Sequence, residues 1–224
     1  ELMFNHIKLE DKLPELDAET LPTGRTYKTP DGKKYPSVTT VLGEESKAGI
    51  LAWRKRVGEE EANRISFQAS SRGTSVHTLA ENYINNDPEW FKGAMPTTID
   101  SFNQIKSILD ARMNNVYAQE VPLYSDKLEV AGRVDLIAEW DNELAIIDFK
   151  TARKPKEEKW IQNYFMQCAF YAAAFYERTG VVIKKSVILI TVDHSEPQIF
   201  ITKPYDYLNE FIKIRQKYRN IYGF

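Results

Sequence analysis

Residues 131–150, AGRVDLIAEWDNELAIIDFK, constrain the fold of this chain more than any other stretch. Two runs rich in Val, Ile, Leu and aromatic residues flank the pair Asp141-Asn142, and both residues of that pair favour tight turns. The pattern predicts a β-hairpin. If the pair forms the turn, Trp140 is paired with Glu143, and the register of the remaining positions follows from that pairing.

Three polar side chains gather on one patch of this predicted hairpin. Counting back from the turn places Asp135 opposite Asp148, and cross-strand neighbours have Cβ atoms about 4.5–5.5 Å apart. Lys150 projects from the same face as Asp148 because side chains alternate along a strand. Two carboxylates about 5 Å apart repel by roughly 3 kcal/mol at an effective dielectric near 20, and a divalent cation reverses that cost. Either Asp alone is better explained as a residue that caps a loop at the end of a strand. Asp135, Asp148 and Lys150 together, on one face of the hairpin, favour a metal site.

The same residues resemble a known family. Gly132-Arg133-Val134-Asp135 followed by Asp148-Phe149-Lys150 is similar to the core motif of the PD-(D/E)XK nuclease superfamily. Within it, the resemblance is to the RecB-type branch and the mitochondrial genome maintenance exonucleases, and it covers roughly residue 35 to the end. It implies an α/β fold with a restriction-endonuclease-like core, in which helices flank a central mixed β-sheet, and with an N-terminal helical extension.

The resemblance also implies the site chemistry. Asp135 and Asp148 would bind Mg²⁺ or Mn²⁺ together with the backbone carbonyl of Phe149, and Lys150 would orient the attacking water. Such oxygen ligands suit hard divalent cations.

His77 follows Gly73 by one helical turn and matches the Gly-x-x-x-His element of RecB-type nucleases, whose histidine contributes to the metal site. Gly73 costs about 1 kcal/mol in a helix interior relative to Ala, so a close approach of another backbone or a ligand is expected there. A lone helical histidine is more often a structural hydrogen-bonding group. Glu81, on the same face as His77, is either a partner of that site or an exposed acid.

Two further matches are weaker on their own. Glu120, between Gln119 and Val121, corresponds to a glutamate that related nucleases place near the metal, although it also reads as an ordinary edge-strand acid. Gln167 and Tyr171 form a Gln-x-x-x-Tyr element one helical turn apart. The resemblance directs both towards the site, whereas the pattern alone would make Tyr171 a core residue and Gln167 a surface one.

Basic and aromatic residues mark the expected path of DNA. Trp53 and Arg54 lie in an aromatic–basic helix that either contacts a DNA strand or is simply a solvated surface. Arg72, beside the Gly-x-x-x-His element, is assigned to DNA as well. The segment after Lys150 is strongly basic and would lie where phosphates must pass. Its assigned DNA-binding residues are Arg153, Lys154 and Lys156.

Composition limits the class of protein. The chain has 224 residues, 42% hydrophobic and 28% charged, which suits one soluble domain with a substantial core. Its net charge of −2 argues against a wholly basic nucleic-acid coat but leaves room for a local basic groove. One cysteine, Cys168, excludes internal disulfides and a four-cysteine iron–sulfur cluster. No run approaches about 18 apolar residues, so no membrane contact is expected.

The first residues are too acidic for a signal or transit peptide, which favours the cytoplasm of a bacterium or of a phage-infected host over an organellar location. A monomer is expected. A single nuclease domain over residues 1–224 is expected, with an irregular segment at 1–36, a helical region at 37–118 and an αβ core at 119–224. A small hairpin is expected at 25–35, and Ser37 is a predicted helix N-cap.

Helices are expected over residues 47–86, in two pieces around Gly58, and over 98–116, 160–179 and 205–222. Strands are expected at 118–125, 181–192 and 198–202, besides the hairpin. Cys168 is expected to be a small buried hydrophobic residue.

These observations predict a metal-dependent exonuclease that degrades single-stranded DNA from a free end, because related exonucleases pass single strands beneath helices placed like those before residue 118. Two other functions stay open. One is a catalytically silent nucleic-acid-binding module, which would have no reason to keep two close carboxylates. The other is a structure-selective endonuclease, which would use the same active site.

Overall fold

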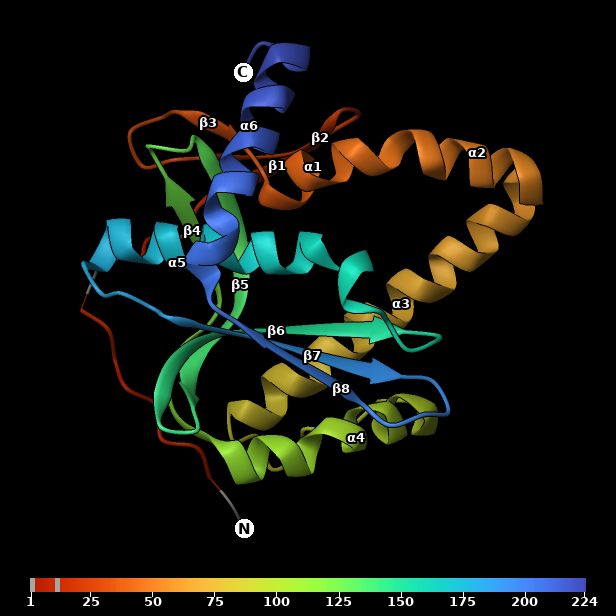
Figure 1. Ribbon diagram of the computed structural model, residues 1–224. Helices are drawn as coiled ribbons and strands as arrows, with labels where there is room; N and C mark the ends of the chain where they lie inside the picture. Colours follow the sequence, from red (N-terminus) through yellow and green to blue (C-terminus); the bar gives the residue numbers. More distant parts are fainter. Residues whose placement is uncertain (1–2, 11–12) are drawn as a thin grey trace.

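The computed structural model describes residues 3–10 and 13–224 and is built on a five-stranded mixed sheet (Figure 1). The strand order is β4-β5-β6-β7-β8, and every neighbouring pair is antiparallel except β6–β7, which is parallel. The strands are β4 Met113–Ser125, β5 Val130–Trp140, β6 Glu143–Ala152, β7 Lys185–Val192 and β8 Gln198–Thr202. The predicted α/β class with a mixed central sheet is confirmed.

The β5–β6 hairpin has the predicted turn and register. Trp140 is paired with Glu143, and the two turn residues, Asp141 and Asn142, have φ values of +50° and +66°. Asp and Asn tolerate this left-handed conformation better than other non-glycine residues, and a two-residue turn of this kind matches the twist of the flanking strands. Local turn chemistry therefore sets the register that later brings the acidic residues together.

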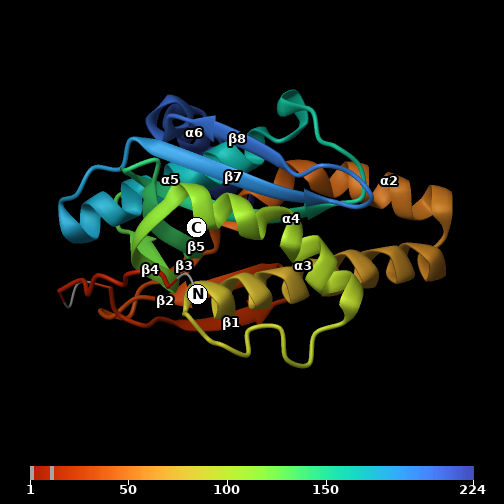
Figure 2. The ribbon, with the colours of Figure 1, turned by 90° about the horizontal axis from the view of Figure 1, so that it is seen from below.

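Helices cover both faces of the sheet (Figures 1 and 2). Helices α3 Glu59–Ile84 and α4 Pro96–Arg112 pack on one face, and α1 Val38–Gly43, α5 Gln162–Thr179 and α6 Leu208–Tyr222 pack on the other. Neighbouring residues on β6 point to opposite layers, so Ile146 belongs to the core under α5 and Ile147 to the core under α3 and α4. Among the described helices, none is long and apolar enough to cross a membrane.

Helices α2 Lys47–Val57 and α3 form an arch that projects from the body (Figure 1). The chain reverses at Gly58, whose φ of +91° suits a glycine. No described residue of α2 is buried, and α3 has none between Ala62 and Val76. Both helices were predicted, with the break at Gly58. The arch thus gains little from the hydrophobic core, which begins only at the second half of α3.

The N-terminal region is more regular than predicted. Strands β1 Asp17–Leu21, β2 Gly24–Lys28 and β3 Lys34–Pro36 form a separate three-stranded sheet, although residues 1–36 were expected to be irregular apart from one hairpin. That hairpin is confirmed as β2–β3. All residues of β1 are exposed, so it carries no apolar alternation that could have marked it. Residues 1, 2, 11 and 12 of this segment lie outside the described residues.

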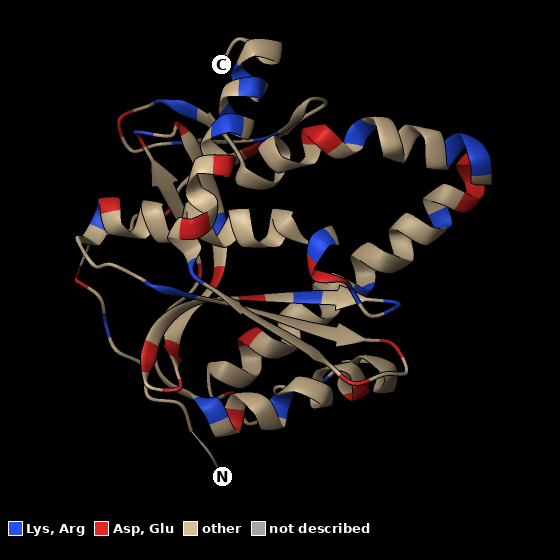
Figure 3. Ribbon diagram, viewed as in Figure 1, with Lys and Arg blue, Asp and Glu red and all other residues tan. Residues whose placement is uncertain are grey.

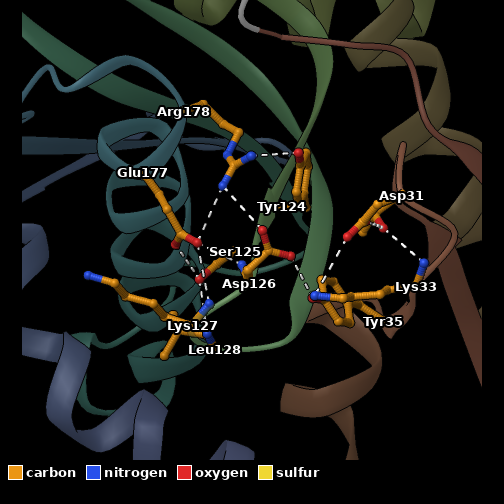
Figure 4. A network of polar contacts seen from close by, with 11 residues as sticks. Asp31, Lys33, Tyr35, Tyr124, Ser125, Asp126, Lys127, Leu128, Glu177 and Arg178 are labelled. Atoms are coloured by element: carbon orange, nitrogen blue, oxygen red, sulfur yellow. Dashed lines mark hydrogen bonds and ion pairs between the residues drawn. The ribbon is translucent and has the colours of Figure 1, made fainter.

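A polar network joins this small sheet to the main one (Figure 4). The Tyr35 hydroxyl donates to Asp126 at 2.6 Å, in the turn between β4 and β5. The Glu177 carboxylate on α5 accepts from the Ser125 hydroxyl and the Asp126 backbone N–H, both at 2.7 Å. Burial and the Asp126 carboxylate raise the pKa of Tyr35, so its proton stays in this contact. The network fixes the start of β5 at the end of the sheet near the small sheet.

Several boundaries differ from the predictions. The helix predicted over 98–116 ends at Arg112, because Val116 belongs to β4, where it exchanges backbone hydrogen bonds with Asn5 and Ile7. Strand β7 begins at Lys185 rather than 181, and Val181 is exposed. Short 3₁₀ turns, Glu44–Ser46, Glu158–Trp160 and Pro204–Tyr207, precede α2, α5 and α6. Ser37 caps α1 as predicted, since its side chain accepts from the Thr40 backbone N–H.

Candidate active site

The candidate active site lies where the β5–β6 ladder ends. The last backbone pair is Leu136 with Ile147, so Asp135 and Asp148 are the next residues, one on each strand. Asp135 reaches across, and its Oδ2 accepts the Phe149 backbone N–H at 2.9 Å. Beyond this point β5 continues only with β4, and β6 only with β7. The hairpin therefore opens at the two aspartates, which the predicted register had placed opposite each other as a continued pair.

His77 reaches this opening from α3. Its Nε2 lies 3.0 Å from Asp135 Oδ2, and its Nδ1 lies 2.7 Å from the Gly73 carbonyl. Both partners are acceptors, so both ring nitrogens carry a proton in this arrangement. Burial lowers the pKa of His77, but Asp135 and the Gly73 carbonyl outweigh it and raise the pKa to about 9. The predicted Gly-x-x-x-His element thus does bring its histidine to the acidic pair.

Gly73 was expected to allow a close approach. A Cβ atom at this position would lie 3.7 Å from Thr151 Oγ1, which is ordinary contact distance. The helix therefore passes over the end of β6 with room to spare, and the contribution of Gly73 to the site is its carbonyl.

Lys150 completes the central group. Its Nζ lies 3.0 Å from Asp148 Oδ2 and donates to Gln167 Oε1 at 3.0 Å. Gln167 donates through Nε2 to the Tyr171 hydroxyl at 3.0 Å, and that hydroxyl donates to the Arg133 carbonyl at 2.8 Å. A continuous row of contacts thus runs from β6 through α5 to β5. The Gln-x-x-x-Tyr element faces the site, as the resemblance implied, and both of its residues are buried.

Gly132 makes space for this row. A Cβ atom on Gly132 would lie 2.8 Å from Val38 Cγ1 and 3.2 Å from Tyr171 Cε1. The first distance is shorter than side chains tolerate, and both neighbours are buried. The glycine of the Gly-x-x-Asp motif therefore permits the Tyr171 ring to pack directly against β5.

Burial and charge act in opposite directions on the two aspartates. Burial raises the pKa of Asp135, but the hydrogen bonds from His77 and Phe149 hold that pKa below its ordinary value. Asp148 is only 2% exposed, and this burial raises its pKa, with Asp135 adding to the effect and Lys150 opposing it. Burial lowers the pKa of Lys150, yet Asp148 and Asp135 together raise it above the ordinary value. The site therefore holds two carboxylates against two cationic side chains.

Glu120 lies alongside Asp135 on β4, between the pairs Gln119–Leu136 and Val121–Val134. Its φ of +47° is unusual for a glutamate within a strand. Burial, with Asp135 and Glu81 nearby, raises its pKa to about 7, and its carboxylate contacts Arg133 Nε at 3.4 Å. Glu120 thus lies in the electrostatic surroundings of Asp135 and of Glu81.

The donor set fits a hard divalent cation. Asp148 Oδ2 is buried, and its one recorded contact is the ion pair with Lys150 at 3.0 Å. A buried carboxylate oxygen with a free lone pair can accept a further ligand. Across residues 3–10 and 13–224, no three His, Cys, Asp or Glu side chains already converge as a complete cage. His77 and Lys150 stand as counter-ions to the carboxylates instead, so binding a metal ion would require His77 to turn its Nε2 from Asp135 to the ion.

The residues assigned to DNA lie in three places, on α3, on α2 and in the segment after β6. Arg72 forms an ion pair with Asp193 at the end of β7, at the edge of a hollow of about 780 Å³ between α3 and α4. Trp53 is half-buried on α2, and Arg54 pairs with Glu59 at 2.7 Å across the tip of the arch. No hydrogen bond or ion pair among the described residues joins these three to the carboxylates.

The basic segment after β6 does adjoin the site. Residues 153–160 are all exposed, and among the described side chains no acid pairs with Arg153, Lys154 or Lys156. Figure 3 shows this Lys- and Arg-bearing segment between β6 and α5.

Sequence reasoning missed two aromatic residues here. Tyr164, in the first turn of α5, places its ring 4.7 Å from Lys150 Nζ, and Trp160 is 72% exposed just before that helix. Tyr164 precedes Gln167 by three residues, so the helical spacing could have found it. Cys168 is fully buried, as predicted.

Comparison with known proteins agrees with this geometry. The chain is 26% identical over 152 residues to mouse mitochondrial genome maintenance exonuclease 1, a match that covers 64% of this chain and 44% of the mouse protein. The chain thus spans less than half the length of that relative. A solved structure of a proposed exonuclease from Eubacterium rectale has 17% sequence identity and a TM-score of 0.46, covering 66% of this chain and 64% of that one. The family model of the PD-(D/E)XK nuclease superfamily matches residues 88–220, more than half of the chain and the part that holds both aspartates and Lys150, and the chain therefore belongs to that superfamily.

Proposed function

We propose that this nuclease is a divalent-metal-dependent exonuclease that degrades single-stranded DNA from a free end. The observation that carries the proposal is the group of Asp135, Asp148 and Lys150, with Asp148 buried, at the opened end of the hairpin. The mitochondrial exonuclease similarity supports the exonuclease class, and the arch supports a single strand as substrate.

Asp135 and Asp148 would hold the ion, with the Phe149 carbonyl and His77 as further ligands. Mg²⁺ and Mn²⁺ both suit this oxygen-rich set. When bound, such an ion supplies a water of lowered pKa and neutralises charge on the phosphate. The two carboxylates hold this position without large motion, because Asp135 is anchored by the Phe149 N–H and Asp148 is buried on the neighbouring strand.

Lys150 would act on the phosphate and on the water. Its ammonium is held on one side by Asp148 and on another by Gln167, which leaves a donor for a substrate oxygen. A fixed cation beside a developing negative charge stabilises the transition state. The Gln167–Tyr171–Arg133 row keeps Lys150 in place, because each member is hydrogen-bonded to the next and Tyr171 is buried.

The arch and the basic segment would guide the strand. Exposed apolar side chains on the arch, Ile50, Leu51 and Phe67, offer surfaces for unstacked bases, and the uncompensated Arg153, Lys154 and Lys156 offer cations for phosphates. A base within a duplex keeps its faces covered by stacking. A strand that passes under an arch must enter by an end, and this argues for exonuclease action.

An endonuclease would use the same carboxylates and lysine, so the site alone does not separate the two classes. The deciding experiment compares end-labelled linear single strands, closed single-stranded circles and blunt duplex, each with Mn²⁺ and with EDTA. The proposal expects degradation of the linear strand only, and only with the metal. Rapid cutting of closed circles would instead favour the endonuclease, and binding without cleavage under every condition would favour a silent binding module.

A further inference from the structure

The indole of Trp160 is exposed to solvent beside the candidate active site. Of the four tryptophans, Trp140 is fully buried, Trp53 and Trp90 are half-buried, and Trp160 is 72% exposed. Tryptophan is highly buried on average in folded proteins, since exposing its rings to water forgoes a large apolar contribution. An exposed indole at this place therefore requires an explanation.

Trp160 is held in position by its surroundings. Its backbone N–H donates to the Glu157 carbonyl at 2.9 Å within a 3₁₀ turn, and the next residue, Ile161, is only 2% exposed and anchors the turn in the core. The segment is also joined to β8, where the Gln198 side chain exchanges two hydrogen bonds, of 2.7 and 2.9 Å, with the backbone of Lys156. The indole is thus presented on a fixed backbone.

The exposed segment that carries this indole holds four cations and two acids. Lys159 Nζ lies 5.2 Å from the ring centroid, although it also pairs with Glu157 at 3.2 Å. Arg153, Lys154 and Lys156 have no acidic partner among the described residues. An apolar ring within a group of uncompensated positive charges complements a ligand that is itself an aromatic ring attached to a negative backbone. A protein partner would more often meet a wider apolar patch.

Trp160 is close in sequence to Tyr164, the aromatic residue that contacts Lys150. Tyr164 follows Trp160 by four residues, at the start of α5, and its ring lies 4.7 Å from Lys150 Nζ. A strand laid over this end of α5 would meet first the indole, then the Tyr164 ring and the ammonium. The exposed indole thus directly precedes α5, four residues before the ring that contacts Lys150.

We propose that Trp160 is a stacking platform for one unpaired nucleobase next to the scissile phosphate, with the surrounding cations on the flanking phosphates. This inference rests on the proposed nuclease function and adds a binding position to it. Stacking uses the face of a base, which every base offers, so the platform holds single strands with little dependence on sequence.

Binding is measured with the full chain in EDTA, by fluorescence anisotropy of labelled single-stranded oligodeoxynucleotides. Trp160→Ala is expected to weaken binding by about 5- to 100-fold, the loss typical of one stacked base. Trp160→Phe, which keeps a flat ring, is expected to retain most of the affinity. The matched control is Phe91→Ala, because Phe91 is an exposed aromatic, 48% accessible, in the segment between α3 and α4.

A single abasic position is then moved along the oligonucleotide. At one position, removal of the base should weaken binding to the wild type but not to Trp160→Ala, while the other positions affect both proteins alike. Equal loss at every position in both proteins would overturn the stacking role, as would a Trp160→Ala affinity equal to that of Phe91→Ala. If the wild type cleaves linear strands but these binding results fail, only this inference falls. A wild type that neither binds nor cleaves overturns the proposed function as well.

Discussion

The opened end of the β5–β6 hairpin and the α2–α3 arch are built in opposite ways. At the hairpin end Asp148 is 2% exposed, Asp135 contacts His77 of α3, and Lys150 donates to Gln167 of α5. On the arch no described residue of α2 is buried, and the ion pairs near its tip, Arg54–Glu59 and Arg64–Glu61, join residues close in sequence. The first region is fixed by the core, while the second is fixed mainly by its own helical hydrogen bonds.

This contrast separates chemistry from substrate handling. A group that must lie within a few tenths of an ångström of a reacting atom gains from rigid support by buried neighbours. A surface that accepts strands of any sequence gains from exposed, adjustable side chains. Changes at the hairpin end should therefore alter turnover or folding, and changes on the arch should alter affinity or local mobility.

The largest effects are expected from Asp148→Asn and Lys150→Ala. Each should reduce cleavage by at least about 10²–10³-fold, the cost of removing one preorganised electrostatic group from a transition state. Calorimetry with Mn²⁺ should tell them apart, since the neutral amide of Asp148→Asn is a poor ligand, whereas Lys150→Ala removes no ligand and should bind the ion. Near-normal turnover in Lys150→Ala would show that the motif is assigned wrongly.

Metal affinity should rise with pH. Without a metal, the pKa of His77 is raised to about 9 from an ordinary 6.5, so its charged form stabilises the fold fully below pH 6.5 and this stabilisation fades as the pH passes 9. A ligating His77 must release its Nε2 proton, so Mn²⁺ affinity should increase by up to about tenfold per pH unit below that pKa. Titration calorimetry from pH 6.5 to 8.5 measures the slope.

The control for this slope is His77→Asn, which cannot titrate and should show a shallower rise. Asp148, whose pKa is also raised by burial, should keep some slope at the acidic end in both proteins. An identical slope in wild type and variant would exclude His77 as a ligand.

Gly132→Ala should destabilise the core by about 1–3 kcal/mol, the usual cost of overpacking. The added methyl group would meet Val38 and Tyr171, and neither has free space to move into. Urea unfolding measures the loss. Displacement of Tyr171 should also lower turnover through Gln167 and Lys150 while DNA affinity stays near that of the wild type.

Gly49→Ala, on the arch, should have the smallest effect and the opposite sign. Nothing lies within 4 Å of the added methyl group, and alanine favours the helix by about 0.5–1 kcal/mol over glycine. Amide exchange in α2 should slow by a few-fold, with the urea midpoint nearly unchanged. A large shift of the urea midpoint would mean that the arch unfolds together with the core and is not supported separately from it.

The sequence revealed the site through local rules. Asp141 and Asn142 determine the turn, the turn determines the register, and strand alternation then places Asp148 and Lys150 on one face. Helical spacing put Gln167 beside Tyr171 in the same way. Each of these steps involves neighbours within a few residues or one hairpin.

Contacts between distant segments could not be read in this way. Val116 is a strand residue because it pairs with Ala138 on β5 and with residues 5–7, more than a hundred positions earlier, although its spacing continued the apolar stripe of α4. Strand β1 was missed for a different reason, since it pairs with the next strand, β2, but has no apolar face that would mark it. The ring of Tyr164 meets Lys150 only because α5 is rotated to bring it there, and the docking of a helix on a sheet is a tertiary property.

The end of the β5–β6 ladder divides the sheet into two leaves. Beyond the last pair, Leu136 with Ile147, one leaf is β4 and β5, bridged through Ala131 to Ser37 at the end of the small sheet, and the other is β6, β7 and β8. Asp135 belongs to the first leaf and Asp148 to the second, so an ion bound by both carboxylates would link the two leaves and restrict their relative motion. The protein should then be stiffer as well as more active with its metal. Slower amide exchange at Phe149, whose N–H joins the two leaves through Asp135, would report that stiffening directly.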